Sequence, residues 1–355
     1  MSPVGKESAA AMSNDMTRPH PTTAAATSPR GSHTFEQLAE PFRRGLKLHC
    51  YRMMGSISEA EDLVQETYLR AWRNFDRFEE RGSFRAWLFR IATNVCLDAL
   101  ASRTQQRRFL PDRRFPPDDR MPDGIPADEV AWIDPYPDSE LEGVLDGTPN
   151  PEARYAAREA VQLAFVAAIQ QLPPRQRAAL LLCDVLGWKV SEVATLLGGS
   201  TTSINSALQR ARTTTERGRR QETVAGAEPD AAQKILLGRY VKAWEALDLD
   251  GFVALLKEDA TYTMPPMSQW YAGRQSIRAF FKWAWKDYEG YRLLTTAANG
   301  QPAFAAYARA GEEWRAHSIQ VLSLGHESVS SLTLFVRPSS PRLFSAFGLP
   351  VTLEG

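Results

Sequence analysis

The sequence predicts a multidomain protein in which two all-α helical domains precede an α+β domain. Three observations support this fold class. Apolar residues recur at helical spacing through 34–108 and again through 153–221. Beyond residue 230, helical patterns give way to four strand-like runs, an order typical of α+β folds. A chain of 355 residues also has room for two or three domains.

Composition excludes several classes of protein. Residues 1–33 are rich in Ala, Ser, Thr and Pro and lack the apolar segment of a secretory signal, so we expect a disordered tail. No uninterrupted apolar run reaches the length of about 18 residues that a membrane span needs. Cys50, Cys96 and Cys183 lie far apart, without the spacing of metal ligands. We therefore expect reduced thiols, no metal site, no membrane contact and a cytoplasmic location.

Charge divides the chain although its 42 basic and 42 acidic residues balance. Residues 34–110 hold 13 basic and 10 acidic side chains, and residues 153–221 hold 10 and 4. Between them, residues 111–152 hold 3 basic and 12 acidic side chains. We place an acidic linker at 109–152, and its length and proline content favour an extended tether. Its charge would suppress nonspecific nucleic-acid contacts, although a solvated spacer explains individual acidic residues equally well.

The first helical block presents a polar helix face. Ser58 is expected to cap its second helix, because the run from Ser58 to Glu61 fits a capping box. Trp72 is expected on the inner side of this helix. Asp62, Gln65 and Glu66 are left for solvent or for a partner.

Aromatic and arginine side chains are dense around a polar loop that precedes the last helix of this block, expected at 84–100. Stacking surfaces beside positive charge suit unpaired nucleic-acid bases. Aromatic residues at three- and four-residue spacing are, however, more often core residues. The residues concerned are Phe75, Phe78, Arg81, Phe84, Arg85, Trp87, Phe89 and Arg90. Composition leaves both interpretations open.

In the second helical block, the residue pattern predicts two short helices around a glycine turn. Gly198 and Gly199 permit the positive φ values of a sharp turn, and Ser200 can cap the helix that follows. Apolar residues at helical spacing would dock this helix on a core: Ile204, Ala207, Leu208 and Ala211. The polar side chains left outward are Thr201, Thr202, Ser203, Asn205, Ser206, Gln209, Arg210 and Arg212. Such hairpins are often mere packing units, but the local basic excess favours DNA binding.

The α+β domain is expected at 230–340, followed by a C-terminal tail at 341–355. Strands are expected at 291–297, 303–309, 318–324 and 329–336, after helices at 230–247, 252–256 and within 264–285. The candidate polar groups are His317, His326, Asp259, Glu313 and Tyr262. None forms a recognisable acid–base dyad, so no catalytic residue and no cofactor is assigned. A regulatory docking surface is preferred over small-molecule sensing, and catalysis is the least favoured role.

Four motifs, in this order, resemble parts of one family. Region 2 of the extracytoplasmic-function sigma factors of the sigma-70 family resembles AEDLVQETYLRAW at 60–72 and GSFRAWLFRIATNVCLDAL at 82–100. Region 4 of the same family resembles LPPRQRAALLLCDVLGWKVSEVATLLGGSTTSINSALQRAR at 172–212. The run WYAGRQSIRAFF at 270–281 is similar to the SnoaL-like domain of one subgroup, which forms a cone-shaped α+β barrel.

The resemblance implies a role for each block. Region 2, at 34–108, would bind the β′ clamp helices of core RNA polymerase through Asp62, Leu63, Gln65 and Glu66. It would recognise and open the −10 element through Arg81, Ser83, Phe84, Arg85, Trp87, Arg90 and Asn94. Region 4, at 153–221, would place the helix 201–212 at the −35 element. The linker would thread through the polymerase cleft.

The partners implied are therefore core RNA polymerase, through β′ and β, and promoter DNA. An anti-sigma factor is compatible with the family but is not readable from the sequence. We expect a sigma factor without enzymatic activity, whose C-terminal domain modulates its output. Two alternatives stay open: a helix-turn-helix regulator that acts without polymerase, and an enzyme housed in residues 230–337.

Overall fold

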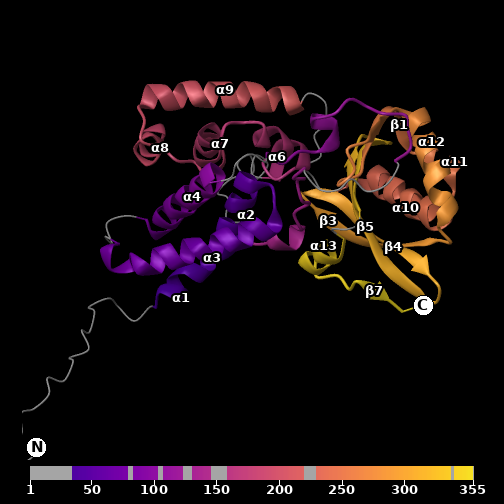
Figure 1. Cartoon of the computed structure of the whole chain (residues 1–355), viewed down its shortest axis with the longest axis horizontal. Helices are drawn as coiled ribbons and strands as arrows, with labels where there is room; N and C mark the ends of the chain where they lie inside the picture. Colours follow the sequence, from indigo (N-terminus) through magenta and orange to yellow (C-terminus); the bar gives the residue numbers. More distant parts are fainter. Residues whose placement is uncertain are drawn as a thin grey trace, which may run out of the picture.

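The computed structural model describes residues 34–78, 83–102, 107–122, 130–144, 158–219, 229–336 and 340–354. Figure 1 shows the helical domains on the left and a sheet with its own helices on the right. The predicted tail at 1–33 lies outside the described residues. The predicted fold class is confirmed, with two helical domains followed by helices and a mixed sheet.

The first helical domain consists of α1 (Phe35–Ala39), α2 (Arg43–Met54), α3 (Ile57–Arg73) and α4 (Phe84–Ser102). The cap predicted at Ser58 is wrong, because the N-cap of α3 is Ser56 and Ser58 lies within the helix. The Ile57 N–H donates to Oδ2 of Asp134, 3.0 Å away, in the linker. A carboxylate at a helix N-terminus satisfies an orphan donor and the helix dipole together. The cap therefore comes from a distant segment that local sequence cannot show.

The second helical domain consists of α6 (Leu163–Gln170), α7 (Pro174–Leu180), α8 (Val190–Leu197) and α9 (Thr201–Arg219). A π-helical turn (Leu181–Val185) continues α7. Gly198 ends α8 with φ 63°, as the glycine turn predicted. Ser200 and Ser203 then exchange hydrogen bonds, each hydroxyl accepting from the other residue's N–H at 3.1 Å. The predicted cap at Ser200 is thus confirmed.

The C-terminal domain packs three helices against one sheet. The helices are α10 (Ala231–Glu245), α11 (Leu249–Ala254) and α12 (Arg274–Ala284). The strands, in spatial order, are β2 (Trp270–Ala272), β1 (Leu256–Thr263), β6 (Val329–Val336), β5 (Glu313–Leu324), β4 (Gln301–Ala310) and β3 (Tyr291–Ala298). The four predicted strands are confirmed. β1 and β2 were not predicted, and β1 pairs with β6 in parallel.

The C-terminal segment predicted to be a tail packs on the sheet instead, so that prediction is wrong for its described part. It forms α13 (Ser340–Ala346) and β7 (Thr352–Leu353), and β7 pairs with β5. The buried Phe344 ring lies edge-on to Tyr307 with 5.1 Å between centroids. The Tyr307 hydroxyl donates to the Pro350 carbonyl at 2.9 Å. Apolar burial and a backbone pairing thus order this segment.

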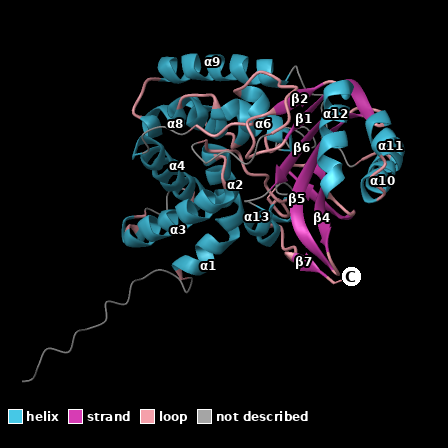
Figure 2. Cartoon of the chain, turned by 45° about the vertical axis from the view of Figure 1, so that its right-hand side comes forward, coloured by secondary structure: helices cyan, strands magenta, loops and turns pink. Residues whose placement is uncertain are grey.

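The sheet separates two apolar cores. One face contacts α10, α11 and α12, whereas residues of the other face belong to the core of the helical domains. Figure 2 shows the sheet between these two groups of helices. Linker residues belong to the core of the helical domains, where Ile133 and Tyr136 are both fully buried. An extended tether is therefore wrong for the described part of the linker, because its apolar side chains pack rather than face solvent.

Candidate polymerase and nucleic-acid interfaces

One face of α3 combines polar and apolar side chains on the surface. Asp62 and Gln65 are exposed, and Leu63 and Glu66 are half-buried. Leu69 and Trp72 continue this face with exposed fractions of 49% and 66%. The inner position predicted for Trp72 is wrong, because the buried stripe runs through its neighbour Ala71. We call the surface formed by Asp62, Leu63, Gln65, Glu66, Leu69 and Trp72 the α3 face.

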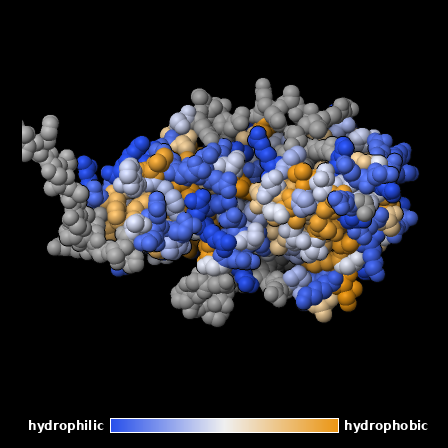
Figure 3. All heavy atoms as spheres, turned by 90° about the horizontal axis from the view of Figure 1, so that it is seen from below, coloured by the Kyte–Doolittle hydropathy of each residue, from blue (hydrophilic) through white to orange (hydrophobic). Residues whose placement is uncertain are grey.

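Neighbouring large apolar side chains that are exposed together often mark a protein interaction site. The large apolar side chains exposed among the described residues are Leu69, Trp72, Ile235, Trp283 and Val351. Figure 3 shows a surface on which apolar patches interrupt hydrophilic side chains. Helical spacing from Asp62 through Leu69 to Trp72 was the sequence signal that could have identified the apolar part of the α3 face.

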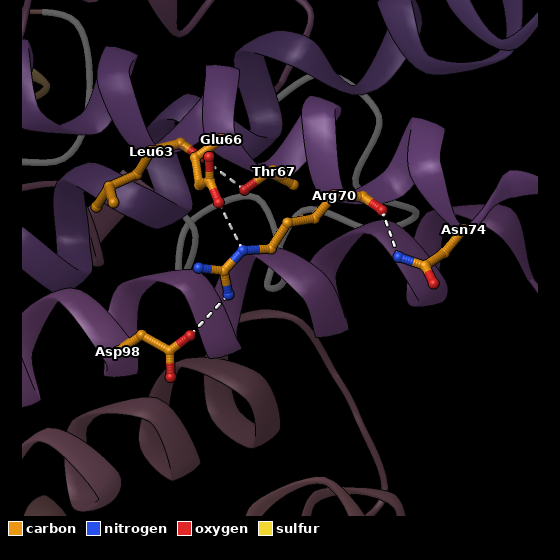
Figure 4. A network of polar contacts seen from close by, with 6 residues as sticks. All are labelled: Leu63, Glu66, Thr67, Arg70, Asn74 and Asp98. Carbon is orange, nitrogen blue, oxygen red and sulfur yellow. Dashed lines mark hydrogen bonds and ion pairs between the residues drawn. The ribbon is translucent and has the colours of Figure 1, made fainter.

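Arg70 joins α3 to α4 through two carboxylates (Figure 4). Its Nε lies 2.7 Å from Oε1 of Glu66, one helical turn earlier. Its Nη1 lies 2.7 Å from Oδ2 of Asp98 on α4. The hydrogen bond with Asp98 and then that with Glu66 raise the pKa of the Arg70 guanidinium. Asn74 donates to the Arg70 carbonyl at 2.8 Å.

A surface pocket of ≈ 330 Å³ lies between α3 and α4. We call it the α3–α4 pocket; its lining residues are Arg70, Asn74, Arg77, Trp87, Ile91 and Asn94. Trp87 and Asn94 belong to the predicted −10 set, and the structure brings them together. Arg70, Asn74 and Arg77 were missed, because they lie in α3 or just after its end and only the packing of this segment against α4 brings them to Trp87. A tryptophan beside guanidinium and amide donors suits a base and its phosphate.

Among the other members of the predicted −10 set, Phe84 lies beside this pocket, with its ring centroid 5.6 Å from that of Trp87. Phe84 packs edge-on against Phe35, Phe75 and Phe78, with centroids 5.4–6.3 Å apart, as a core residue does. The Ser83 hydroxyl accepts from the Ala86 N–H at 3.4 Å, at the start of α4. Arg85 stacks over the Phe89 ring, whereas Arg90 is exposed. Arg81 lies outside the described residues.

The recognition helix α9 has the orientation that the sequence predicted. All eight residues of the −35 set are exposed. Ile204, Leu208 and Ala211 are buried on the opposite side. Thr202, Ser206 and Arg210 follow one another at four-residue spacing on the exposed side. Their contact with DNA remains a prediction.

Two members of the −35 set are already engaged within the protein. The Ser203 hydroxyl takes part in the cap of α9. Arg212 forms a two-point ion pair with Asp184, with N–O distances of 2.7 and 2.8 Å. Asn205, Gln209 and Arg212 also line an open cleft of ≈ 600 Å³ beside Asp184. Arg210 is therefore better placed than Arg212 to meet a phosphate.

Asn299, at the β3–β4 turn, joins the C-terminal domain to both helical domains and the linker. It is fully buried and has φ 57°, in the left-handed region that Asn tolerates better than most residues. Its amide nitrogen donates to the Tyr51 hydroxyl at 3.0 Å and to the Val161 carbonyl at 2.8 Å. Its Oδ1 accepts from the Tyr136 N–H at 2.8 Å, and its own N–H donates to the Tyr136 carbonyl at 2.8 Å. We call Asn299 and these partners the junction.

A linker carboxylate borders the junction. Oδ1 of Asp138 accepts from the Gly300 N–H at 2.8 Å. Burial raises the pKa of Asp138 to about 6, although the Gly300 hydrogen bond and Arg158 oppose this shift. The acidic residues Asp134 and Asp138 thus hold backbone donors of other segments, which neither a tether nor a solvated spacer would require.

A buried arginine connects the two helical domains. Arg177 on α7 donates to the carbonyls of Ile169, Gln170 and Met53, at the C-terminal ends of α6 and α2. Helix C-termini are the negative ends of the helix dipoles, so they stabilise this guanidinium, which forms no ion pair with a carboxylate of the described residues. Burial nevertheless lowers the pKa of Arg177 to about 9. Gln170 completes the contact by donating to the Arg52 carbonyl at 2.9 Å.

The interior between sheet and helices is filled with aromatic rings. Tyr240 stacks on Phe304 at 5.4 Å, and Trp244 lies edge-on to Phe281 at 5.4 Å. The polar groups considered for catalysis differ in their exposure. Asp259, Glu313 and His326 are exposed, Tyr262 is buried, and His317 lies 3.1 Å from the Tyr288 hydroxyl.

Two further findings concern the described part of the chain. It contains no group of three or more His, Cys, Asp or Glu residues that could hold a metal ion. Within the same residues, every helix is too short or too polar to cross a membrane.

Three family models match successive parts of the chain. They are Sigma-70 region 2 at 38–107, Sigma-70 region 4 at 162–214 and the SnoaL-like domain at 237–328. The ECF RNA polymerase sigma factor SigG of Mycobacterium tuberculosis is 44% identical over 324 residues, which cover 90% of this chain and 85% of the relative. SigJ of the same organism is 31% identical over 224 residues, or 63% of this chain and 62% of the relative.

The crystal structure of Mycobacterium tuberculosis SigJ has a similar fold, with a TM-score of 0.56 at 23% identity. The match covers 88% of this chain and 98% of that structure. The chain therefore belongs to the extracytoplasmic-function sigma factors of the sigma-70 family, with a SnoaL-like domain at its C-terminal side.

Proposed function

We propose that the protein joins core RNA polymerase in the cytoplasm and directs promoter-specific transcription initiation. It recognises the −35 and −10 elements and aids DNA melting by binding, without covalent chemistry. The observation that carries this proposal is the presence of sigma regions 2 and 4 in one chain, each with its predicted polar face exposed.

The α3 face is the surface that meets the β′ clamp helices. Asp62, Gln65 and Glu66 supply polar contacts, and Leu69 and Trp72 supply the apolar area that anchors protein interfaces. A regulator that acts without polymerase has no use for such a surface, so the α3 face favours the sigma factor over that alternative.

The two DNA-reading surfaces differ in what they recognise. Thr202 and Ser206 of α9 meet base edges in the major groove of the −35 element, and Arg210 meets a phosphate. The α3–α4 pocket receives the separated −10 strand, with Trp87 available for stacking and Asn94 for hydrogen bonds.

The C-terminal domain regulates the two promoter-reading regions by contact rather than by catalysis. Its β3–β4 turn bonds to Tyr51 of region 2, to Tyr136 of the linker and to the backbone just before α6 of region 4. A domain bonded to all three segments biases their arrangement. Asp259, Glu313 and His326 are exposed, which gives the enzymatic alternative no support.

Reconstituted transcription tests the proposed function. Core polymerase with the full chain should produce transcripts from promoters of the protein's own genome, whereas core polymerase alone should not. The absence of initiation at every such promoter would refute the proposal. Removal of residues 223–355 should change the transcript yield; an unchanged yield and an unchanged polymerase affinity would refute the regulatory role alone.

A further inference from the structure

We propose that Arg70 couples polymerase binding to capture of the −10 strand. In the free protein, Glu66 and Asp98 together hold its guanidinium. When polymerase engages Glu66, Arg70 becomes available to a phosphate of the strand in the α3–α4 pocket. This inference rests on the proposed function and adds a link between its two region 2 surfaces.

Arg70 connects the two surfaces by position. It lines the α3–α4 pocket with Arg77 and Trp87. It is also paired with Glu66, a member of the α3 face, at 2.7 Å. Figure 4 shows its guanidinium between the Glu66 and Asp98 carboxylates, which belong to different helices. No other residue of the α3–α4 pocket forms an ion pair with the α3 face among the described contacts.

The two ion pairs are weak enough to be exchanged. The side chains of Glu66, Arg70 and Asp98 are 40%, 38% and 64% exposed, so solvent screens both attractions. A polymerase group that binds the Glu66 carboxylate competes directly with Arg70. Once that bond is lost, Asp98 alone retains the guanidinium.

A phosphate is a better partner for Arg70 than one exposed carboxylate. Guanidinium and phosphate form two parallel charge-assisted hydrogen bonds, and the strand also releases counterions. Before polymerase binds, the carboxylates of Glu66 and Asp98 offset the positive charges of Arg70 and Arg77, the two arginines that line the pocket. With its guanidinium held by both carboxylates, Arg70 is less available to a DNA phosphate in the free protein.

The experiment measures the salt dependence of binding to a single-stranded oligonucleotide. The probe is the nontemplate −10 segment of a promoter that is active in the reconstituted transcription assay. Free protein and holoenzyme are titrated at several KCl concentrations for wild type, Arg70→Gln, Asp98→Asn and the double variant. Arg278→Gln is the matched control, because Arg278 forms an exposed ion pair with Asp250 in the C-terminal domain.

In the holoenzyme, Arg70→Gln should lower the slope of log K against log salt by about 0.7, the value for one phosphate contact on a single strand. In the free protein, Arg70→Gln should leave the slope unchanged. Asp98→Asn should strengthen binding by the free protein several-fold, and this gain should disappear in the double variant. Arg278→Gln should match wild type throughout.

A wild-type slope for the Arg70→Gln holoenzyme would overturn the inference. So would a gain from Asp98→Asn that persists without Arg70, since removal of a negative charge alone would then explain it. A holoenzyme that binds no −10 strand in any variant would instead refute the proposed function, so the two failures are distinguishable.

Discussion

The α3 face and the junction hold their polar groups in opposite ways. On the α3 face, Glu66 is partly exposed and its partner Arg70 is shared with a second carboxylate. At the junction, Asn299 is fully buried and each of its side-chain polar atoms has a partner. Exposed ion pairs are readily exchanged, whereas a buried polar group without its partner is costly. The first region is therefore suited to bind partners, and the second to fix how the domains are arranged.

Removal of the junction amide should have the largest effect. Asn299→Leu leaves the Val161 carbonyl and the Tyr136 N–H without partners and removes one of the two hydrogen bonds of the Tyr51 hydroxyl. It also places a branched side chain at a positive φ. We expect the free energy of unfolding to fall by about 4 kcal/mol, measured by urea denaturation. Asn74→Ala is the control, because it removes one exposed hydrogen bond and should cost less than about 1 kcal/mol. Equal losses of unfolding free energy in the two variants would show that the buried junction hydrogen bonds contribute no more to stability than an exposed one.

The apolar end of the α3 face should matter for binding and not for folding. Trp72→Ala should weaken core polymerase binding by about 2 kcal/mol, because exposed tryptophans are frequent interface anchors. Its unfolding free energy should change little, since 66% of the side chain is exposed. Fluorescence titration with labelled core polymerase measures the affinity. Trp283→Ala, an exposed tryptophan of α12, serves as control and should bind as wild type does.

The sequence predicted the α3 face only in part, for a physical reason. Helical periodicity identified Asp62, Gln65 and Glu66, and it identified the exposed and buried sides of α9, because both depend on residues within a few turns. The junction depends on Asn299 and Tyr51, 248 positions apart, so no local pattern contains it. β1 escaped prediction for a related reason. Three consecutive charged or exposed residues, 257–259, interrupt its strand pattern, and its pairing partner lies in β6.

The contribution of Asp138, which borders the junction, to the stability of the protein should depend on pH. The pKa of Asp138 is raised in the folded protein to about 6, so the folded state binds a proton more tightly than the unfolded chain does. The contribution of Asp138 to stability is complete below its pKa in the unfolded chain, near 4, and is lost as the pH rises through 6. Asp138→Asn mimics the protonated form, and we expect it to stabilise the protein by roughly 1–2 kcal/mol at pH 7.

The measurement is urea denaturation of wild type and Asp138→Asn between pH 4 and pH 7.5. The difference in unfolding free energy should grow with pH over this range. A constant difference would show that Asp138 does not titrate at the junction. Asp118→Asn is the control, because the Arg120 hydrogen bond lowers the pKa of that exposed carboxylate instead.

Two arginines of α9 should differ in their effect on DNA. Arg210→Gln should weaken holoenzyme binding to −35 duplex DNA by about 1 kcal/mol and lower the salt slope by about 0.9. Arg212→Gln should do less, because Asp184 already holds that guanidinium. Filter binding at several salt concentrations measures both. A larger effect from Arg212 would show that DNA displaces Asp184, and our assignment of the phosphate contact to Arg210 would be wrong.

We expect both promoter-reading surfaces to bind promoter DNA only after the α3 face has bound polymerase. Fluorescence anisotropy of labelled promoter DNA measures this dependence, with the protein alone, core polymerase alone and the two together. We predict sequence-specific binding only when both proteins are present. Equally tight and equally specific binding by the protein alone would contradict the account and favour a helix-turn-helix regulator that works without polymerase.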